Sequence, residues 1–166
     1  MKEAVLKDLI GGHLVRLVIT AAQGVYPDAY EGKAVSGHGL FSIDSTLAVS
    51  QLACSPVSQI LSFLTMETDS MLRLGNRMLP GRPKEESLKL VLSANAEILN
   101  FVSSRLAWLL SKLENTSDTE ISPPEVSNFS GDRAFRIRAD EGLCFDFTCA
   151  PHNLAFRYSA EIQTLP

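Results

Sequence analysis

The longest regular pattern in the chain covers residues 84–113, where apolar residues return at three- and four-residue steps. This spacing is typical of an amphipathic helix that buries one stripe of side chains. The stripe consists of Leu88, Val91, Ile98, Leu99, Val102, Leu106, Leu109 and Leu113. The pattern therefore predicts one long helix, of roughly 30 residues, with a single buried face.

Small and polar residues occupy the opposite side of this predicted helix. At about 100° per residue, Ser93, Glu97, Asn100 and Ser104 fall close to one line along that side. Alanines at positions 94, 96 and 107 keep the flanks of the line low, so another protein could approach it closely. These residues are either a docking face or an ordinary solvated surface, and geometry alone does not separate the two readings.

Helical spacing also predicts two further helices, over residues 2–22 and 69–79. The first is expected to bury a stripe made of Val5, Leu9, Leu14, Leu17 and Val18. Gly11 and Gly12 should weaken or bend this helix, because glycine is a poor helix former. The second helix ends at the Pro-Gly-Arg-Pro run of residues 80–83, which links it rigidly to the long helix.

Strand-length runs on either side of the helices predict two antiparallel meanders. The runs cover residues 39–43, 46–54 and 57–65 before the helices, and residues 134–139, 143–149 and 154–162 after them. Residues 25–38 are predicted to be irregular or a short edge strand, and residues 115–124 a polar loop. This order predicts an α+β fold, residues 1–166 as a single domain, with the long helices packed on one face of an antiparallel sheet.

Composition narrows the function further. A net charge of -4 offers no basic field for nucleic acid, which is bound through clustered Lys and Arg. No uncharged apolar run reaches the length of about 18 residues that a membrane helix needs, so a cytoplasmic protein is expected. The three cysteines match no disulfide framework and are predicted to be buried thiols; they are Cys54, Cys144 and Cys149.

Several kinds of catalytic chemistry find no support in the sequence. His13, His38 and His152 lie far apart and in no metal-ligand spacing, so each is expected to be structural or on the surface. The chain has no GxSxG nucleophile elbow, and cysteines on buried strands are usually inert. Neither histidine-based metal catalysis nor covalent catalysis is therefore predicted.

The polar face of the long helix nevertheless resembles a known signature. Ser93, Glu97 and Asn100, followed after 22 intervening residues by Pro123, resemble the motif of the CheC/CheX/FliY chemotaxis phosphatases. The predicted order of helices and strands is similar to CheX over essentially the whole chain. Only one motif is present, since Arg73 stands where a second motif would have Glu, and this resembles CheX more than CheC.

The resemblance implies that the chain hydrolyses the aspartyl-phosphate of a CheY-like receiver domain. In that role Asn100 orients the attacking water, Glu97 pairs with the active-site lysine of the receiver, and Ser93, Ser104 and Pro123 contact the partner. It also implies a homodimer, and Mg²⁺ supplied by the receiver with no cofactor bound by this chain.

Two alternatives remain open. The chain could be a non-catalytic adapter that uses the same helix to bind a receiver or a flagellar switch protein. A small-molecule binding domain is a further possibility, although no convergent polar pocket is visible in the sequence.

Overall fold

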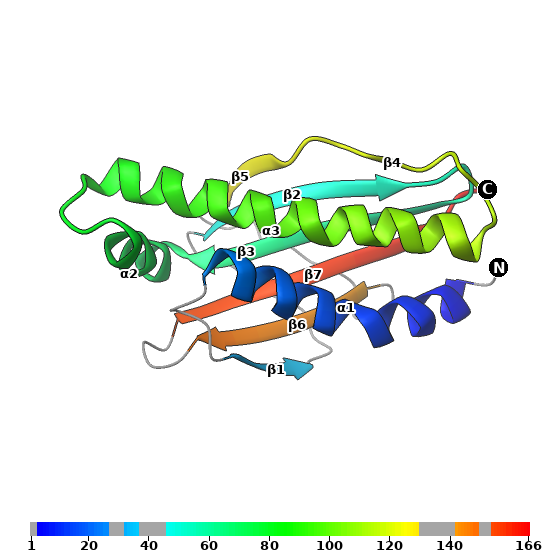
Figure 1. Cartoon of the computed structure of the whole chain (residues 1–166), viewed down its shortest axis with the longest axis horizontal. Coiled ribbons are helices and arrows are strands. Elements are labelled where there is room, and N and C mark those ends of the chain that lie inside the picture. The colour runs from blue at the N-terminus through cyan, green and yellow to red at the C-terminus, as the bar shows by residue number, and fades with distance from the viewer. Residues whose placement is uncertain (1–2, 27–31, 37–45, 130–141, 150–153) are drawn as a thin grey trace.

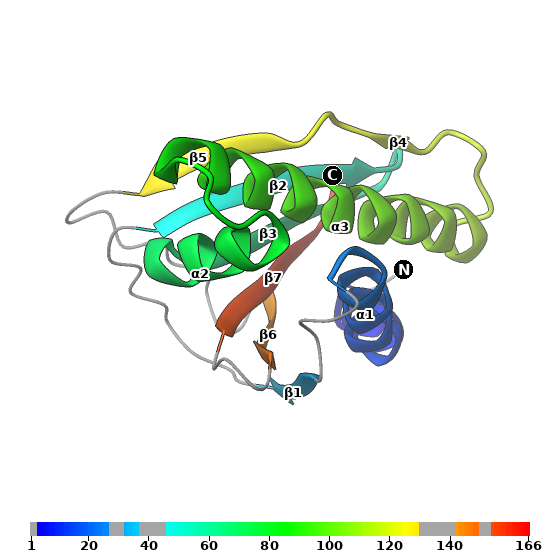
Figure 2. The same ribbon diagram turned by 60° about the vertical axis from the view of Figure 1, so that its left-hand side comes forward.

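A seven-stranded antiparallel sheet carries the described helices on one face (Figures 1 and 2). The computed structural model describes residues 3–26, 32–36, 46–129, 142–149 and 154–166. The elements in chain order are α1 (Glu3–Val25), β1 (Gly32–Ser36), β2 (Thr46–Cys54), β3 (Ser58–Glu67), α2 (Thr68–Met78), α3 (Lys84–Leu113), β4 (Glu120–Ile121), β5 (Glu125–Phe129), β6 (Gly142–Cys149) and β7 (Leu154–Thr164). The predicted α+β fold is confirmed.

The strands follow the order β1-β6-β7-β3-β2-β4, and β5 also pairs with β2. β1 confirms the short edge strand that was one of the two readings of residues 25–38. The predicted polar loop over residues 115–124 is wrong in part, because β4 pairs Glu120 and Ile121 with the end of β2. β5 was not predicted at all. The strands predicted at residues 39–43 and 134–139 lie outside the described residues.

The core lies between the sheet and the helices, and α3 buries the stripe that its spacing predicted. Val91, Ile98, Leu99, Val102 and Leu106 are all fully buried. The remaining members, Leu88, Leu109 and Leu113, are partly buried and pack against this core. The helix phase predicted from the sequence is therefore confirmed for α3.

The predicted phase of α1 is wrong in its first half. Val5 and Leu9 are 47% and 42% exposed, whereas Leu6 and Ile10 are fully buried. The sequence has apolar residues on two neighbouring rows here, and the packing of α1 against α3 and the sheet decides which row is covered. The helix also continues unbroken through Gly11 and Gly12.

The C-terminal end of α3 turns the chain back along β2. Asn115 adopts the left-handed conformation with a φ of 51°, and the N–H of Thr116 donates to the carbonyl oxygen of Ser111 at 3.0 Å. This is a Schellman-type ending, which asparagine tolerates better than most residues. The chain then runs beside the edge of the sheet, where Figure 1 shows β4 and β5 next to β2. The return places the segment after α3 close to the outer face of that helix.

A buried tyrosine occupies the middle of the sheet. Tyr158 on β7 is fully buried, and its hydroxyl lies 2.7 Å from the hydroxyl of Ser62 on β3. Burial raises the pKa of the Tyr158 hydroxyl above its ordinary value, and the hydrogen bond to Ser62 opposes that shift only in part. The phenol is therefore neutral at physiological pH, and its role is packing within the core.

We predict that Gly75→Ala destabilises the protein through the contact between α2 and α3. A Cβ on Gly75 would lie 2.8 Å from both the Cβ and the carbonyl oxygen of Ser87, and the backbone atom cannot move aside easily. Overpacking of this kind costs about 1–3 kcal/mol. The control is Gly12→Ala on α1, where no atom lies within 4 Å of the added Cβ. We expect the control to be neutral or to stabilise the helix by roughly 0.5–1 kcal/mol.

Denaturant unfolding of the two variants and the wild type measures both effects. Equal midpoints for Gly75→Ala and the wild type would contradict the close approach of α2 and α3.

Candidate functional site on the outer face of α3

The outer face of α3 presents the predicted site residues in the expected order. Ser93, Glu97 and Ser104 are exposed, whereas Asn100 is half-buried. The buried stripe on the opposite side fixes this orientation, because Leu99 and its neighbours point into the core. The outward position predicted for Glu97 and Asn100 is thus confirmed for Glu97 and only partly correct for Asn100.

The partial burial of Asn100 has a specific cause, which is a hydrogen bond from the sheet. The Nε2 of Gln51 on β2 donates to the Oδ1 of Asn100 at 2.6 Å. The same Nε2 donates to the backbone carbonyl oxygen of Ser122 at 2.8 Å. One side-chain amide therefore connects the long helix to the segment that returns after it.

The segment at Ser122 and Pro123 is itself tied to β2. The backbone N–H of Ser122 donates to the carbonyl oxygen of Leu52 at 2.8 Å, and the N–H of Leu52 donates to the hydroxyl of Ser122 at 3.0 Å. Pro123 follows directly and is exposed. The structure thus brings the distal proline of the sequence motif into the same part of the surface as Asn100, with Gln51 between them.

Gln51 and Ser122 are site residues that the sequence analysis missed. A signal for Gln51 was present, because it alternates with Val49 and Ala53 along a strand, at a position where an apolar residue is expected. Gln51 is only 2% exposed. A buried polar side chain needs a hydrogen-bond partner, and this one finds it in the candidate site.

Two exposed aromatic side chains extend the outer face of α3 toward its C-terminal end. Phe101 is 38% exposed and Trp108 is 56% exposed. The guanidinium of Arg105 lies 5.7 Å from the centre of the Phe101 ring, and the amine of Lys112 lies 5.9 Å from the Trp108 ring. These distances are typical of cation–π contacts. Large apolar groups at such an exposed position are common in protein-docking surfaces.

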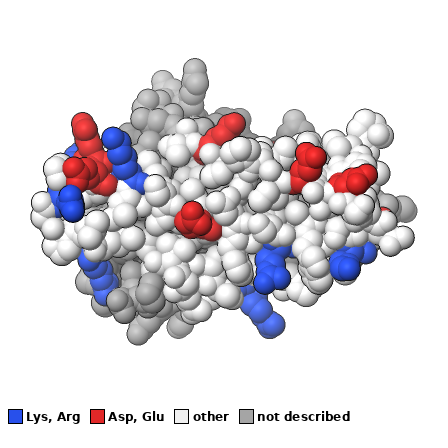
Figure 3. Space-filling model, turned by 45° about the horizontal axis from the view of Figure 1, so that its top comes forward, with Lys and Arg blue, Asp and Glu red and all other residues white. Residues whose placement is uncertain are grey.

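Acidic side chains are scattered over the face that contains α3, β4 and β5. Figure 3 shows them there, with Lys and Arg gathered toward the lower edge and one end of the view. Glu97, Glu120 and Glu125 are all exposed. This distribution favours a partner that presents a cationic group to the middle of the face.

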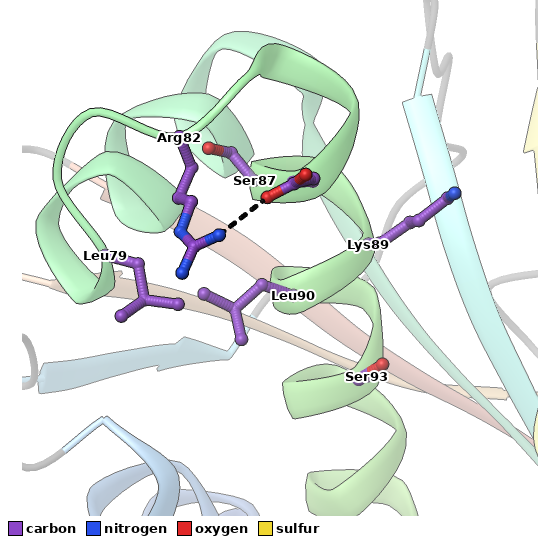
Figure 4. Close-up of a pocket in the computed structure, with 7 residues that line it drawn as sticks. Leu79, Arg82, Ser87, Lys89, Leu90 and Ser93 are labelled. Atoms are coloured by element: carbon purple, nitrogen blue, oxygen red, sulfur yellow. Dashed lines mark hydrogen bonds and ion pairs between the residues drawn. The ribbon is translucent and has the colours of Figure 1, made fainter.

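A shallow hollow opens at the N-terminal end of α3. It has a volume of about 370 Å³ and is lined by Leu79, Arg82, Glu86, Ser87, Lys89, Leu90 and Ser93. Figure 4 shows the side chain of Arg82 reaching across it, and Arg82 forms an ion pair of 3.2 Å with Glu86. Both partners of this pair are more than half exposed. Its one buried polar lining residue is Ser87, whereas small-molecule sites typically gather several convergent polar groups.

Other candidate chemistry has little support among the described residues. They contain no group of three or more His, Cys, Asp or Glu side chains that could hold a metal ion. His13 is exposed and Cys54 is half-buried, not buried as predicted. His38 and His152 lie outside the described residues, as do the side chains of Cys144 and Cys149. No described helix combines the length and the apolar character needed to cross a membrane.

Known structures share this fold. Neither a protein-family model nor a curated protein sequence matches the chain. A chain of the CheX-CheY-BeF3-Mg+2 complex from Borrelia burgdorferi is 16% identical and has a TM-score of 0.61, over 90% of this chain and 97% of that chain.

Two further structures give the same result. Chemotaxis protein CheX from Vibrio vulnificus is 16% identical, with a TM-score of 0.60 over 90% of this chain and 99% of that chain. FliY from Thermotoga maritima is 16% identical, with a TM-score of 0.59 over 94% of this chain and 89% of that chain. At such identity the likeness concerns the fold, and at that level the predicted resemblance to the CheC/CheX/FliY proteins is confirmed.

Proposed function

We propose that this chain, which has the fold of the CheX, CheC-like and FliY chemotaxis proteins, is a phosphatase for the aspartyl-phosphate of a CheY-like receiver domain. One observation carries the proposal. An exposed carboxylate, Glu97, and a held carboxamide, Asn100, lie less than one turn apart on the outer face of α3. In this reading the pair is the reactive part of the surface.

The chemistry required of such a phosphatase is modest. An acyl phosphate is already activated, and the receiver supplies the Mg²⁺ that neutralises charge on the phosphoryl oxygens. The phosphatase then has only to bring a water molecule into line with the phosphorus. In the proposed complex the Asn100 amide enters the receiver site and hydrogen-bonds that water, as a glutamine does in small GTPases.

Glu97 has a different proposed role, which is docking. Its exposed carboxylate pairs with the active-site lysine of the receiver through a charge-assisted hydrogen bond. The acidic character of the surrounding face favours the approach of such a cation. Ser93, Ser104 and Pro123 then contact the partner, and their small size allows the close approach that Asn100 needs.

A homodimer is part of the same proposal. β1 and β5 lie at opposite ends of the described sheet. An edge strand carries unpaired backbone groups that can pair with a second copy of the chain. Pairing along β1 leaves the outer face of α3 free for the receiver, whereas β5 begins two residues after Pro123 and lies on the side of that face.

A non-catalytic adapter is the alternative function, because docking through Glu97 does not require hydrolysis. The partner of such an adapter is a receiver or a flagellar switch protein, as the resemblance to the CheC/CheX/FliY proteins implies. The two functions differ in one measurable property, which is the loss of phosphate from a bound receiver.

We expect the wild-type protein to accelerate phosphate loss from at least one CheY-like receiver. The receivers are phosphorylated with a small acyl phosphate donor, mixed with the protein, and followed by release of inorganic phosphate after the donor is removed. Acceleration of about tenfold or more over the receiver alone supports the phosphatase. Binding to a phosphorylated receiver without acceleration supports the adapter instead. Absence of both effects across a panel of receivers rejects both functions.

A further inference from the structure

Gln51 is a polar residue at a core-facing position of β2. Its neighbours on the same face of the strand, Val49 and Ala53, are fully buried apolar residues, and Gln51 itself is 2% exposed. On β3 the residues opposite them are Leu64, Ser62 and Ile60. The Ser62 hydroxyl is hydrogen-bonded to Tyr158, so the contacts that explain an amide at position 51 are those to Asn100 and Ser122.

The chemistry of these contacts fixes how the Gln51 amide is turned. The backbone carbonyl oxygen of Ser122 can only accept a hydrogen bond, so the group that Gln51 turns toward it must be the NH2. The same NH2 faces the Asn100 side chain at 2.6 Å. Asn100 must therefore turn its carbonyl oxygen inward, since its own NH2 would meet another donor.

The inward position of Oδ1 determines which groups Asn100 presents to the outside. With Oδ1 held by Gln51, the Nδ2 group of Asn100 is directed away from that hydrogen bond. The Oδ1 atom keeps a second lone pair. The outer edge of the amide thus offers one donor group and one acceptor site in a fixed arrangement, which is what holding a single water molecule in one orientation requires.

The other end of the Gln51 amide supports the same orientation. Its Oε1 atom is buried and has no hydrogen-bond partner among the described residues. Turning the amide over would place Oε1 against two acceptor oxygens and leave the NH2 in the position without a partner. An unsatisfied buried acceptor destabilises the folded state by about 1–3 kcal/mol in general. Proteins tolerate such a loss of stability mainly at functional sites.

We propose that Gln51 is a positioning residue for the reaction, acting through Asn100. It holds the Asn100 amide with Oδ1 inward and Nδ2 outward, and it couples that amide to the segment of Ser122 and Pro123. The inference rests on the proposed phosphatase function and deepens it, because it names the residue that prepares Asn100 for the water molecule before the receiver binds.

Single-turnover kinetics of Gln51→Leu test this role. Leucine has a similar volume and cannot donate, so the chain should fold while Asn100 loses its fixed orientation. We expect the rate at saturating protein to fall about tenfold and the half-saturating concentration to change less than about twofold. The matched control is Gln59→Leu on β3, where the amide donates to Gln163 Oε1 at 2.7 Å in an exposed position. We expect this control to keep the wild-type rate.

An NMR measurement tests the hydrogen bond without any receiver. The side-chain amide protons of Gln51 are identified by their disappearance in Gln51→Leu. In Asn100→Ala, one of these two proton resonances should shift, because its acceptor is gone. In Asn100→Asp, where a carboxylate oxygen still accepts, the same resonance should remain close to that of a hydrogen-bonded proton.

The two measurements separate the possible failures. If the wild type is active and Gln51→Leu has the same rate, the inference is wrong and the proposed phosphatase function is retained. The same holds if Gln59→Leu loses as much rate as Gln51→Leu. The inference is also wrong if the side-chain amide resonances of Gln51 do not shift in Asn100→Ala. A wild-type protein without activity on any receiver rejects the proposed function, and the positioning role is then rejected with it, whatever the NMR result.

Discussion

Asn100→Ala is expected to remove the catalysed loss of phosphate almost completely while the protein still folds and binds the receiver. Without the amide, the docked complex contains no group that orients the attacking water. Loss of a group that positions the nucleophile lowers the rate of the chemical step by about a hundredfold or more. Because Asn100 is half-buried and its packing neighbours remain in place, its removal should affect stability much less than activity.

The measurement is phosphate loss in a single turnover at saturating protein, with receiver binding measured in parallel. Glu97→Ala is the contrasting variant, since its exposed carboxylate is assigned to docking. That variant should weaken binding more than it lowers the saturated rate, and the loss of affinity should diminish at high salt. A wild-type rate for Asn100→Ala at saturation would make Asn100 an ordinary surface residue and favour the adapter.

Leu99→Ala is expected to cause the largest loss of stability among the changes considered for α3. Leu99 is fully buried in the core between the helices and the sheet. Truncation of a buried leucine to alanine removes apolar contacts and leaves a cavity, at a cost of about 2–5 kcal/mol. Ser104→Ala on the exposed side of the same helix is the control and should change stability by less than about 0.5 kcal/mol.

Thermal or denaturant unfolding of the two variants provides the comparison. Similar stabilities for Leu99→Ala and Ser104→Ala would mean that α3 does not turn Leu99 into the core, and Glu97 and Asn100 would then not lie on its outer face. A marked loss for Leu99→Ala with an unchanged Ser104→Ala supports the assignment of Glu97 and Asn100 to the surface.

The sequence determined the features of this protein that depend on local periodicity. The long helix and its buried side were predicted because Val91, Ile98 and Leu106 leave only one way to cover an apolar stripe. The same reasoning placed Glu97 on the outside. The class of fold followed from the order of helical and strand patterns, since few arrangements bury the apolar faces of such a series.

Only the tertiary structure decided between equivalent local patterns. α1 has apolar side chains on two adjacent rows, and contact with α3 and the sheet covers Leu6 and Ile10 and leaves Val5 and Leu9 exposed. β4 and β5 are short and mix apolar with polar residues without a clear period, and they become strands through pairing with β2. Periodicity contains no information about such long-range partners.

The candidate site shows the same division. The spacing along one helix places Glu97 and Asn100 on the same face, because a regular helix fixes their relative positions, and the resemblance to the CheC/CheX/FliY motif made them candidate site residues. Gln51 lies 49 residues before Asn100, and Ser122 lies 71 residues after Gln51. Only the packed sheet brings these residues together. The sequence thus determined which residues α3 presents, whereas the tertiary structure decided how Asn100 is held, because its hydrogen-bond donor comes from another element of the fold.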